Sequence, residues 1–254
     1  LDEYSIVAIE DFNMGAMENK GLNIFNTSLV LADPRTTTDS RYKDIESVIG
    51  HEYFHNWTGN RITCRDWFQL CLKEGLTVFR DQEFSQDVGS PTITRINSIN
   101  HLINYQFSED NSPMAHPPRP DEFVEINNFY TTTVYEKSAE LIRMLKRTLG
   151  STCFAQAMAQ YFTIYDGKAI TLEDFFKVME DVSGRDLKQF MLWFKEAGSP
   201  RLSVHEDYNA ESQEYSLTVT QETKHKYLKN ISPRHMPVEI ALFAKDGSQL
   251  SVSP

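Results

Sequence analysis

Two histidines and a glutamate at positions 51–55 could bind and use a metal ion. His51 and His55 are four residues apart, so on a helix they lie on one face, one turn from each other. Two neutral imidazoles in that arrangement can supply two ligands of a zinc site. Glu52 follows the first histidine directly and can reach a water molecule at the metal as a general base. The pattern H-E-x-x-H therefore predicts a hydrolytic zinc site, although so short a pattern needs support from its surroundings.

A third ligand must come from elsewhere, because catalytic zinc sites take three protein ligands and keep one position open. Glu74 is the candidate, since it lies in the middle of a predicted helix at 66–87 among leucines and other apolar residues. A carboxylate in such surroundings is costly to bury without a partner, and a metal ion supplies one. Asp81, on the same face two turns later, could orient a ligand histidine, but a surface salt bridge is the simpler interpretation.

The residues around the pentapeptide predict a helix over 39–58 that is buried. Thr38, Asp39 and Ser40 are residue types that favour a helix N-terminus, and Gly59 favours its end. The alternative is a surface helix with two histidines and a solvated carboxylate. That alternative is disfavoured by the apolar neighbours of the motif, which are Val48, Ile49, Tyr53, Phe54 and Trp57.

The composition is that of a globular protein with one large or two smaller domains, since 40% of the 254 residues are hydrophobic. A formal net charge of −11 argues against a nucleic-acid partner. No apolar run is long enough for a transmembrane helix, and no signal peptide is visible. The chain opens at Leu1 in strand-like sequence, so we expect a piece of a longer protein. Cys64, Cys71 and Cys153 lack C-x-x-C spacing, which is typical of reduced thiols in a cytosolic protein.

Two predicted strands, at 4–9 and 22–31, flank a segment that contains small residues. Its glycine and asparagine favour a simple turn between the strands. The alternative is a strand edge whose small residues let a peptide backbone pair with it, with Glu18 offering a negative charge to a cationic group. The residues alone favour the turn. The segment consists of Met14, Gly15, Ala16, Met17, Glu18 and Asn19.

The remaining chain predicts helices and then strands. A helix is expected at 92–107, followed by a proline-rich loop. The next helix starts near Glu136 and ends at Gly150, which places Tyr135 near its N-terminus. A phenol there could donate a hydrogen bond to an oxyanion, although a core or rim tyrosine is the simpler interpretation. Further helices are expected at 151–165, 171–183 and 186–197, and strands at 201–206, 214–221 and 237–244, with a hairpin turn at Asp246-Gly247 and a domain boundary near 198–200.

Three of these features together resemble the zinc aminopeptidases of the aminopeptidase N family. They are G-A-M-E-N at 15–19, H-E-x-x-H at 51–55, and Glu74 after eighteen intervening residues. The wider runs H-E-Y-F-H-N-W-T-G-N-R and L-K-E-G-L-T-V-F are especially similar to bacterial members, and the similarity extends into the tail. The resemblance implies an α+β fold, with a thermolysin-like zinc peptidase domain over 1–198 and the start of a β-sandwich domain over 199–254.

The same resemblance implies the catalytic apparatus. His51, His55 and Glu74 match the family's ligands for one Zn²⁺ ion per chain. Glu52 matches its general base, which takes a proton from water and later gives it to the leaving amine. Tyr135 matches the tyrosine that stabilises the oxyanion of the transition state.

The resemblance also implies how substrate is bound, and it reverses the preference for a simple turn. The segment Gly15–Asn19 would pair with the substrate backbone, with Glu18 binding the free α-amino group. Met14 and Tyr130 would form the pocket for the first side chain. We therefore expect a cytoplasmic, monomeric aminopeptidase of broad specificity that acts on peptides with a free N-terminus, without nucleic-acid or membrane partners.

Two alternatives stay open. A related branch of the family hydrolyses an epoxide lipid as well as peptides with the same zinc constellation. A structural zinc or a peptide-binding module would instead predict a closed site with four ligands and would leave Glu52 without a task. Family members also carry an upstream β domain and a large C-terminal helical domain. We therefore expect this stretch alone to cleave peptides weakly.

Overall fold

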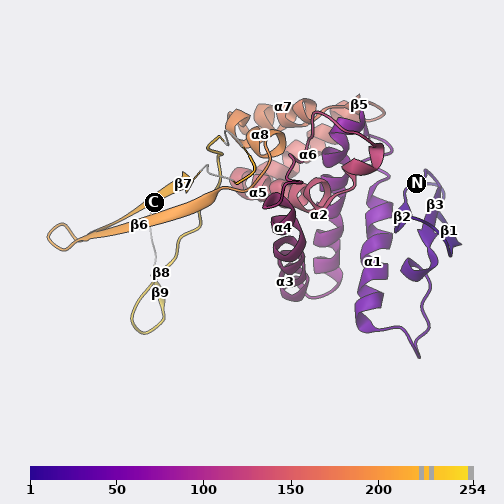
Figure 1. Ribbon diagram of the computed structural model, residues 1–254, viewed down its shortest axis with the longest axis horizontal. Helices are drawn as coiled ribbons and strands as arrows, with labels where there is room; N and C mark the ends of the chain where they lie inside the picture. The colour runs from indigo at the N-terminus through magenta and orange to yellow at the C-terminus, as the bar shows by residue number, and fades with distance from the viewer. Residues whose placement is uncertain (223–225, 229–231, 251–254) are drawn as a thin grey trace.

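The computed structural model of the chain describes residues 1–222, 226–228 and 232–250 (Figure 1). Helices form the body, a small sheet lies beside it, and β-ribbons project from the opposite side, which confirms the predicted α+β class. Within the described residues, no helix has the length and apolar character that a bilayer span requires. The elements are β1 (Ser5–Ile9), β2 (Ala16–Met17), β3 (Leu22–Asn26), α1 (Asp39–Phe54), β4 (Thr63–Cys64), α2 (Leu70–Val88), α3 (Pro91–His101), α4 (Phe107–Asp110), α5 (Ser138–Leu149), α6 (Ser151–Tyr165), β5 (Ala169–Ile170), α7 (Leu172–Ser183), α8 (Lys188–Lys195), β6 (Arg201–Asn209), β7 (Glu214–Glu222), β8 (Leu242–Phe243) and β9 (Gln249–Leu250).

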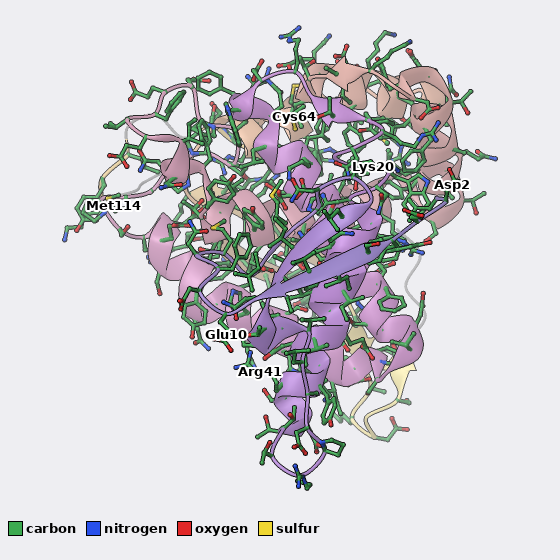
Figure 2. All side chains as sticks on the ribbon, turned by 90° about the vertical axis from the view of Figure 1, so that its right-hand side faces the viewer. Asp2, Glu10, Lys20, Arg41, Cys64 and Met114 are labelled. Carbon is green, nitrogen blue, oxygen red and sulfur yellow. The ribbon has the colours of Figure 1, made fainter. Side chains whose placement is uncertain are left out.

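The N-terminal sheet has the strand order β1-β3-β2. β1 runs parallel to β3, and the short β2 runs antiparallel to it at the other edge. Figure 2 shows this sheet in front of the helices, with Glu10 and Lys20 at its opposite ends. The simple turn that the residues alone favoured for 15–19 is therefore wrong, because Ala16 and Met17 form an edge strand.

The strand predicted at 22–31 is shorter in the structure because Asn26 ends it. Oδ1 of Asn26 accepts hydrogen bonds from the backbone N–H of Ser28 (3.0 Å) and from its hydroxyl (2.7 Å). These bonds start a 3-10 turn, η1 (Thr27–Leu29). A side chain that binds the backbone just ahead of it competes with the strand ladder.

The helix α1 begins where the sequence predicts, with Oγ1 of Thr38 accepting from a backbone N–H of the first turn (3.3 Å). It ends earlier than the predicted residue 58, because the chain turns sharply after His55. The N–H of Asn60 donates to the carbonyl of His55 (2.9 Å). Gly59 has a φ of +146°, which few other residues adopt, and a Cβ there would lie 3.0 Å from Nδ1 of His55. The turn therefore packs directly against the second histidine of the motif.

The surroundings of α1 differ from the prediction of a helix buried by its apolar residues. Its buried residues are Gly50 and Glu52, whereas Tyr53 is 39% exposed and Trp57, just beyond its end, is 37% exposed. The ring of Tyr53 contacts both that of Trp57 and that of Tyr4, with centroids 5.4 and 5.5 Å away, respectively. The prediction failed because α1 packs against α2 through its polar motif face.

The helix α2 lies at the centre of the body and packs against α1, α3 and α5 (Figure 1). It follows a 3-10 turn, η2 (Trp67–Gln69), and both Glu74 and Asp81 on it are buried. Gly75 is a point of very close approach to α5, since a Cβ at this position would lie 2.5 Å from Cβ of Ser138. A larger residue at 75 therefore requires one of the two helices to move.

Two π-helical turns lie beside each other, and one of them, η5 (Thr133–Lys137), packs against α2. η3 (Leu102–Gln106) joins α3 to α4, and η5 begins the helix that continues as α5. They contact each other through a hydrogen bond from Nε2 of Gln106 to Oγ1 of Thr133 (3.3 Å). The predicted helices at 92–107 and before Gly150 are thus confirmed, but their π turns were not predicted. Such turns occur frequently at functional sites.

The later helices follow the predictions closely. Thr171 and Asp174 form the predicted capping box at the start of α7. The parallel pair β4–β5, which joins the segment after α1 to the segment before α7, was not predicted. The centre of this core consists of fully buried aromatic rings, namely Phe175, Phe176, Phe190 and Phe194.

The tail forms two antiparallel ribbons, β6–β7 and β8–β9. The first extends away from the helices (Figure 1). Gly247 has a φ of +85° and makes the predicted turn of the second, but only residues 242–243 of the strand predicted at 237–244 form a strand. Arg234 holds the tail to the body by donating to the carbonyls of Gly198 (2.6 Å) and Ala197 (2.7 Å).

Candidate metal centre and active site

The side chains of His51, His55 and Glu74 come together between α1 and α2. Nε2 of His51 lies 2.9 Å from Nε2 of His55. Oε2 of Glu74 lies 3.3 and 3.2 Å from these two nitrogens, respectively. Two residues one turn apart on α1 and one residue of the neighbouring helix therefore form a single cluster of potential ligand atoms.

The hydrogen bond that each imidazole makes through Nδ1 determines that Nε2 faces this cluster. Nδ1 of His51 lies 2.7 Å from Oδ2 of Asp81, and Nδ1 of His55 lies 2.9 Å from the carbonyl oxygen of Thr58. Because both partners are acceptors, each imidazole in its neutral form carries its proton on Nδ1 and presents a lone pair at Nε2. In that form three acceptor atoms face one another, and Oε2 of Glu74 has no hydrogen-bond partner among the described residues.

A cation between these atoms removes their mutual repulsion. Their separations of 2.9–3.3 Å are close to the ~3.4 Å that separates ligand atoms around a tetrahedral zinc with bonds of ~2.1 Å. Two imidazoles and a carboxylate are also a ligand set of catalytic zinc sites. The donor atoms of this chain therefore fit a zinc ion.

Glu52 lies beside the cluster with only 5% of its surface exposed. Burial, reinforced by the charges of Glu18 and Glu74, raises the pKa of Glu52 to about 8, although His51 opposes the shift. Its Oε2 atom is buried and has no hydrogen-bond partner within the described part of the chain. This carboxyl group has an oxygen available for a water molecule or a ligand, which suits proton transfer.

Glu18 is 7% exposed and forms an ion pair with Lys73, whose ammonium group also lies 2.6 Å from Oε1 of Glu74. Burial alone would raise the pKa of Glu18, but His55 and Lys73 hold it below its ordinary value. The backbone of Glu18 is fixed by Asn60, whose Nδ2 donates to its carbonyl (2.9 Å). A buried, ionised carboxylate thus lies close to the cluster of potential ligand atoms.

Tyr135 extends from η5 toward the same cluster, where its hydroxyl interacts with Glu74. Burial raises the pKa of Tyr135, and the charge of Glu74 raises it further, so this phenol keeps its proton and remains a donor. The ring of Tyr130 lies with its centroid 6.2 Å from that of Tyr135 and is 37% exposed. A protonated phenol at this position can stabilise a developing negative charge.

These groups line one cavity of about 1400 Å³ between the small sheet and the helices. The edge strand β2 contributes to its wall, as do both tyrosines. Asn19 does not line the cavity; its carbonyl accepts from the N–H of Leu22 (3.0 Å), and its role remains a prediction. The predicted residues that the cavity brings together are Met14, Gly15, Ala16, Met17, Glu18, His51, Glu52, His55, Glu74, Tyr130 and Tyr135.

Sequence reasoning missed or misjudged several supporting residues. The simpler interpretation of Asp81 as a surface salt bridge is wrong, because Asp81 is 5% exposed and bonds to a ring nitrogen of His51. The sequence did contain a signal for this role, since Asp81 lies seven residues after Glu74 and therefore on the same face of the helix. Lys73 and Thr77 were given no role, and the Oγ1 atom of Thr77 lies 3.1 Å from Nδ1 of His55. Both lie in the run L-K-E-G-L-T-V-F that carries the family resemblance, but their contacts depend on how the helices pack.

Two protein-family models match the chain. Residues 1–194 match the Peptidase family M1 domain, and residues 198–253 match a domain of unknown function with an Ig-like fold.

Curated relatives include the aminopeptidase N of Escherichia coli, 56% identical over 248 residues, and that of Haemophilus influenzae, 55% identical over 251 residues. These alignments cover 97% and 98% of this chain but only 28% and 29% of the relatives. The chain thus spans less than a third of their length. A solved structure of Legionella pneumophila aminopeptidase A in complex with aspartic acid superposes with a TM-score of 0.77 at 36% identity, over 86% of this chain and 24% of that one.

Proposed function

Since the chain belongs to peptidase family M1, we propose that the protein containing it is a zinc-dependent aminopeptidase. It would release N-terminal residues from peptides with broad specificity. The observation that carries this proposal is the convergence of three potential ligand atoms from His51, His55 and Glu74 beside an oxygen of Glu52 that has no hydrogen-bond partner in the part of the chain that the structure describes. The names of the bacterial relatives support an exopeptidase within the family.

His51, His55 and Glu74 would hold the zinc ion. When bound, the zinc would polarise the scissile carbonyl and lower the pKa of a water molecule toward ~7. Asp81 and the carbonyl of Thr58 orient the two imidazoles for this purpose from the outer side.

Glu52 would move the proton. Its buried carboxylate takes a proton from the attacking water and passes it to the nitrogen of the leaving amine. The low exposure of Glu52 supports this role, because a group that is poorly solvated in its charged form accepts a proton readily. Tyr135 would donate its hydroxyl proton in a hydrogen bond to the oxyanion that forms on the carbonyl.

Glu18 would fix the cleavage position by binding the free α-ammonium group of the substrate. An ion pair at that point leaves only the first peptide bond within reach of Glu52. The edge strand β2 would pair with the substrate backbone as part of the Gly15–Asn19 segment, and Met14 and Tyr130 would form the first side-chain pocket. Side chains would then be selected loosely, because Met14 is flexible and both residues are partly exposed.

We further propose that residues 1–198 form the catalytic domain and that 199–254 begin a β-sandwich, a division supported by the two family matches. A cytoplasmic monomer remains our expectation for the protein. The three cysteines are free in the structure, which is compatible with a reducing compartment.

The test combines metal content with activity. Wild type and Glu52→Ala should each bind one zinc, and wild type should hydrolyse alanine and arginine amides until a chelator removes the metal. Glu52→Ala should retain zinc and lose activity by at least ~100-fold. The proposal fails if full-length wild type binds zinc and cleaves neither amide, or if Glu52→Ala is as active as wild type.

A further inference from the structure

The turn that carries Tyr135 has an unusual conformation. η5 is π-helical and forms the first turn of the helix that continues through α5 to Leu149. Thr133 and Val134, which precede Tyr135, are completely buried. A π turn is rarely stable by itself, so the direction of Tyr135 depends on the groups that hold the two ends of the turn.

Glu109 holds the N-terminal end. Its Oε2 atom accepts hydrogen bonds from the hydroxyl of Thr132 (2.8 Å), the backbone N–H of Thr133 (2.8 Å) and the hydroxyl of Thr133 (2.6 Å). The residue at the helix start, Thr132, makes no capping bond with its own side chain. A carboxylate on α4 therefore caps this helix across the fold, and its charge is favourable at a helix N-terminus.

The next residue, Asp110, holds the other end. Its Oδ2 atom accepts from the ammonium group of Lys137 (2.7 Å), which also donates to the carbonyl of Gly198 (3.0 Å) and is only 4% exposed. Adjacent carboxylates thus bind the first and last residues of the five-residue turn. Tyr135 lies between these two anchored points.

We propose that Glu109 is a positioning residue that directs the hydroxyl of Tyr135 toward the metal cluster. Glu109 does not line the cavity, so it acts through the turn and does not contact substrate. The proposal rests on the role of Tyr135 in the proposed function. It goes further, because it attributes the orientation of the Tyr135 side chain to a residue that does not line the cavity.

The experiment uses the full-length, zinc-loaded protein and a double-mutant cycle. Glu109→Ala should lower kcat for an alanine amide by about tenfold or more, with KM changed less than about twofold, because only the transition-state contact is misplaced. Glu109→Gln keeps a carbonyl acceptor and should recover most of kcat. In the Tyr135→Phe background, Glu109→Ala should have no further effect on kcat.

Zinc content and the affinity for a phosphinic dipeptide analogue provide readouts besides activity. Zinc content should be unchanged, while the affinity for the tetrahedral analogue should fall in Glu109→Ala. Ser108→Ala, an exposed neighbour on the same helix, is the control and should behave like wild type. If Glu109→Ala does not fold, Thr133→Val removes the hydroxyl donor to Glu109 and should give a smaller loss with the same dependence on Tyr135.

Failure of this proposal is distinguishable from failure of the proposed function. A folded Glu109→Ala protein with wild-type kcat, or an equal loss in the wild-type and Tyr135→Phe backgrounds, overturns the positioning role of Glu109 alone. Wild-type kcat in Tyr135→Phe itself overturns the catalytic role of Tyr135, and the positioning role with it.

Discussion

Lys73 and Glu74 are neighbours in the sequence and are also ion-paired, with Nζ of Lys73 2.6 Å from Oε1 of Glu74. Consecutive residues of a helix do not normally face each other. Here the long lysine side chain bends back because Glu18 lies on the same side. The two oxygens of Glu74 thereby have separate partners, Oε1 binding the ammonium group and Oε2 facing the two imidazoles.

We predict that Lys73→Met destabilises the metal-free protein more than the zinc-loaded protein. Without zinc, the variant leaves Glu18 and Glu74 buried without their ammonium partner, which costs about 3 kcal/mol. Bound zinc supplies positive charge and offsets part of that loss. Urea unfolding of both forms measures the two differences. The exposed Lys43→Met is the control, and an equal loss in both forms contradicts the prediction.

Asp81 should affect metal affinity without binding the metal. Its bond to Nδ1 of His51 fixes the ring orientation, so Asp81→Ala should weaken zinc binding about 10- to 100-fold. Asp81→Asn, which keeps an acceptor oxygen, should lose less. Competition with a chromophoric chelator measures the affinity. Asp87→Ala, on the exposed end of the same helix, should leave the affinity unchanged. Wild-type affinity in Asp81→Ala would show that His51 needs no orienting partner.

Asp110 should make the free energy of unfolding decrease as the pH falls into the acidic range. Burial alone would raise the pKa of this carboxyl group, but Lys137 and the donors of Ser199 and Gln106 hold it below its ordinary value. A lowered pKa in the folded state means that the stabilisation is present above the unfolded value of ~3.9 and is lost as the pH falls through the folded pKa. Arg234 also faces this group and favours its charged form.

The measurement is the free energy of unfolding of wild type and Asp110→Asn between pH 3 and 7. Near pH 7 the variant should be less stable by about 3 kcal/mol, because Lys137 stays buried without its counter-charge. The difference should begin to shrink below the unfolded value of ~3.9, where the unfolded chain takes up a proton at this position, and it should shrink further as the pH falls toward the lowered pKa of folded Asp110. The exposed Asp121→Asn is the control. A difference that stays constant over this range would exclude the ionised carboxylate as its cause.

The clustering of the two motif histidines was predictable to the extent that local spacing determines it. His51 and His55 face one direction because helical geometry requires it, and both capping predictions at Thr38 and Thr171 were correct for the same local reason. The contacts of Lys73 and Glu109 were not predictable, since they join segments that only the packing of helices brings together.

Burial was the least predictable property. Apolar neighbours indicated a buried α1, yet Tyr53 and Trp57 remain exposed while Glu52 is covered. Hydrophobicity predicts which residues gain from burial on average, but a functional site buries polar groups where its chemistry needs them. The same reason makes the surface interpretation of Asp81 wrong.

The contact between Gly75 and Ser138 has a consequence for altering or redesigning this scaffold. Alanine is ordinarily the better helix residue, by about 1 kcal/mol, so a stability-guided redesign would replace the glycine. Here the added methyl group would push the helix of Glu74 away from the helix that begins with the turn of Tyr135. The absence of a side chain at position 75 thus sets the distance between these two helices, and with it how closely Glu74 and Tyr135 approach each other.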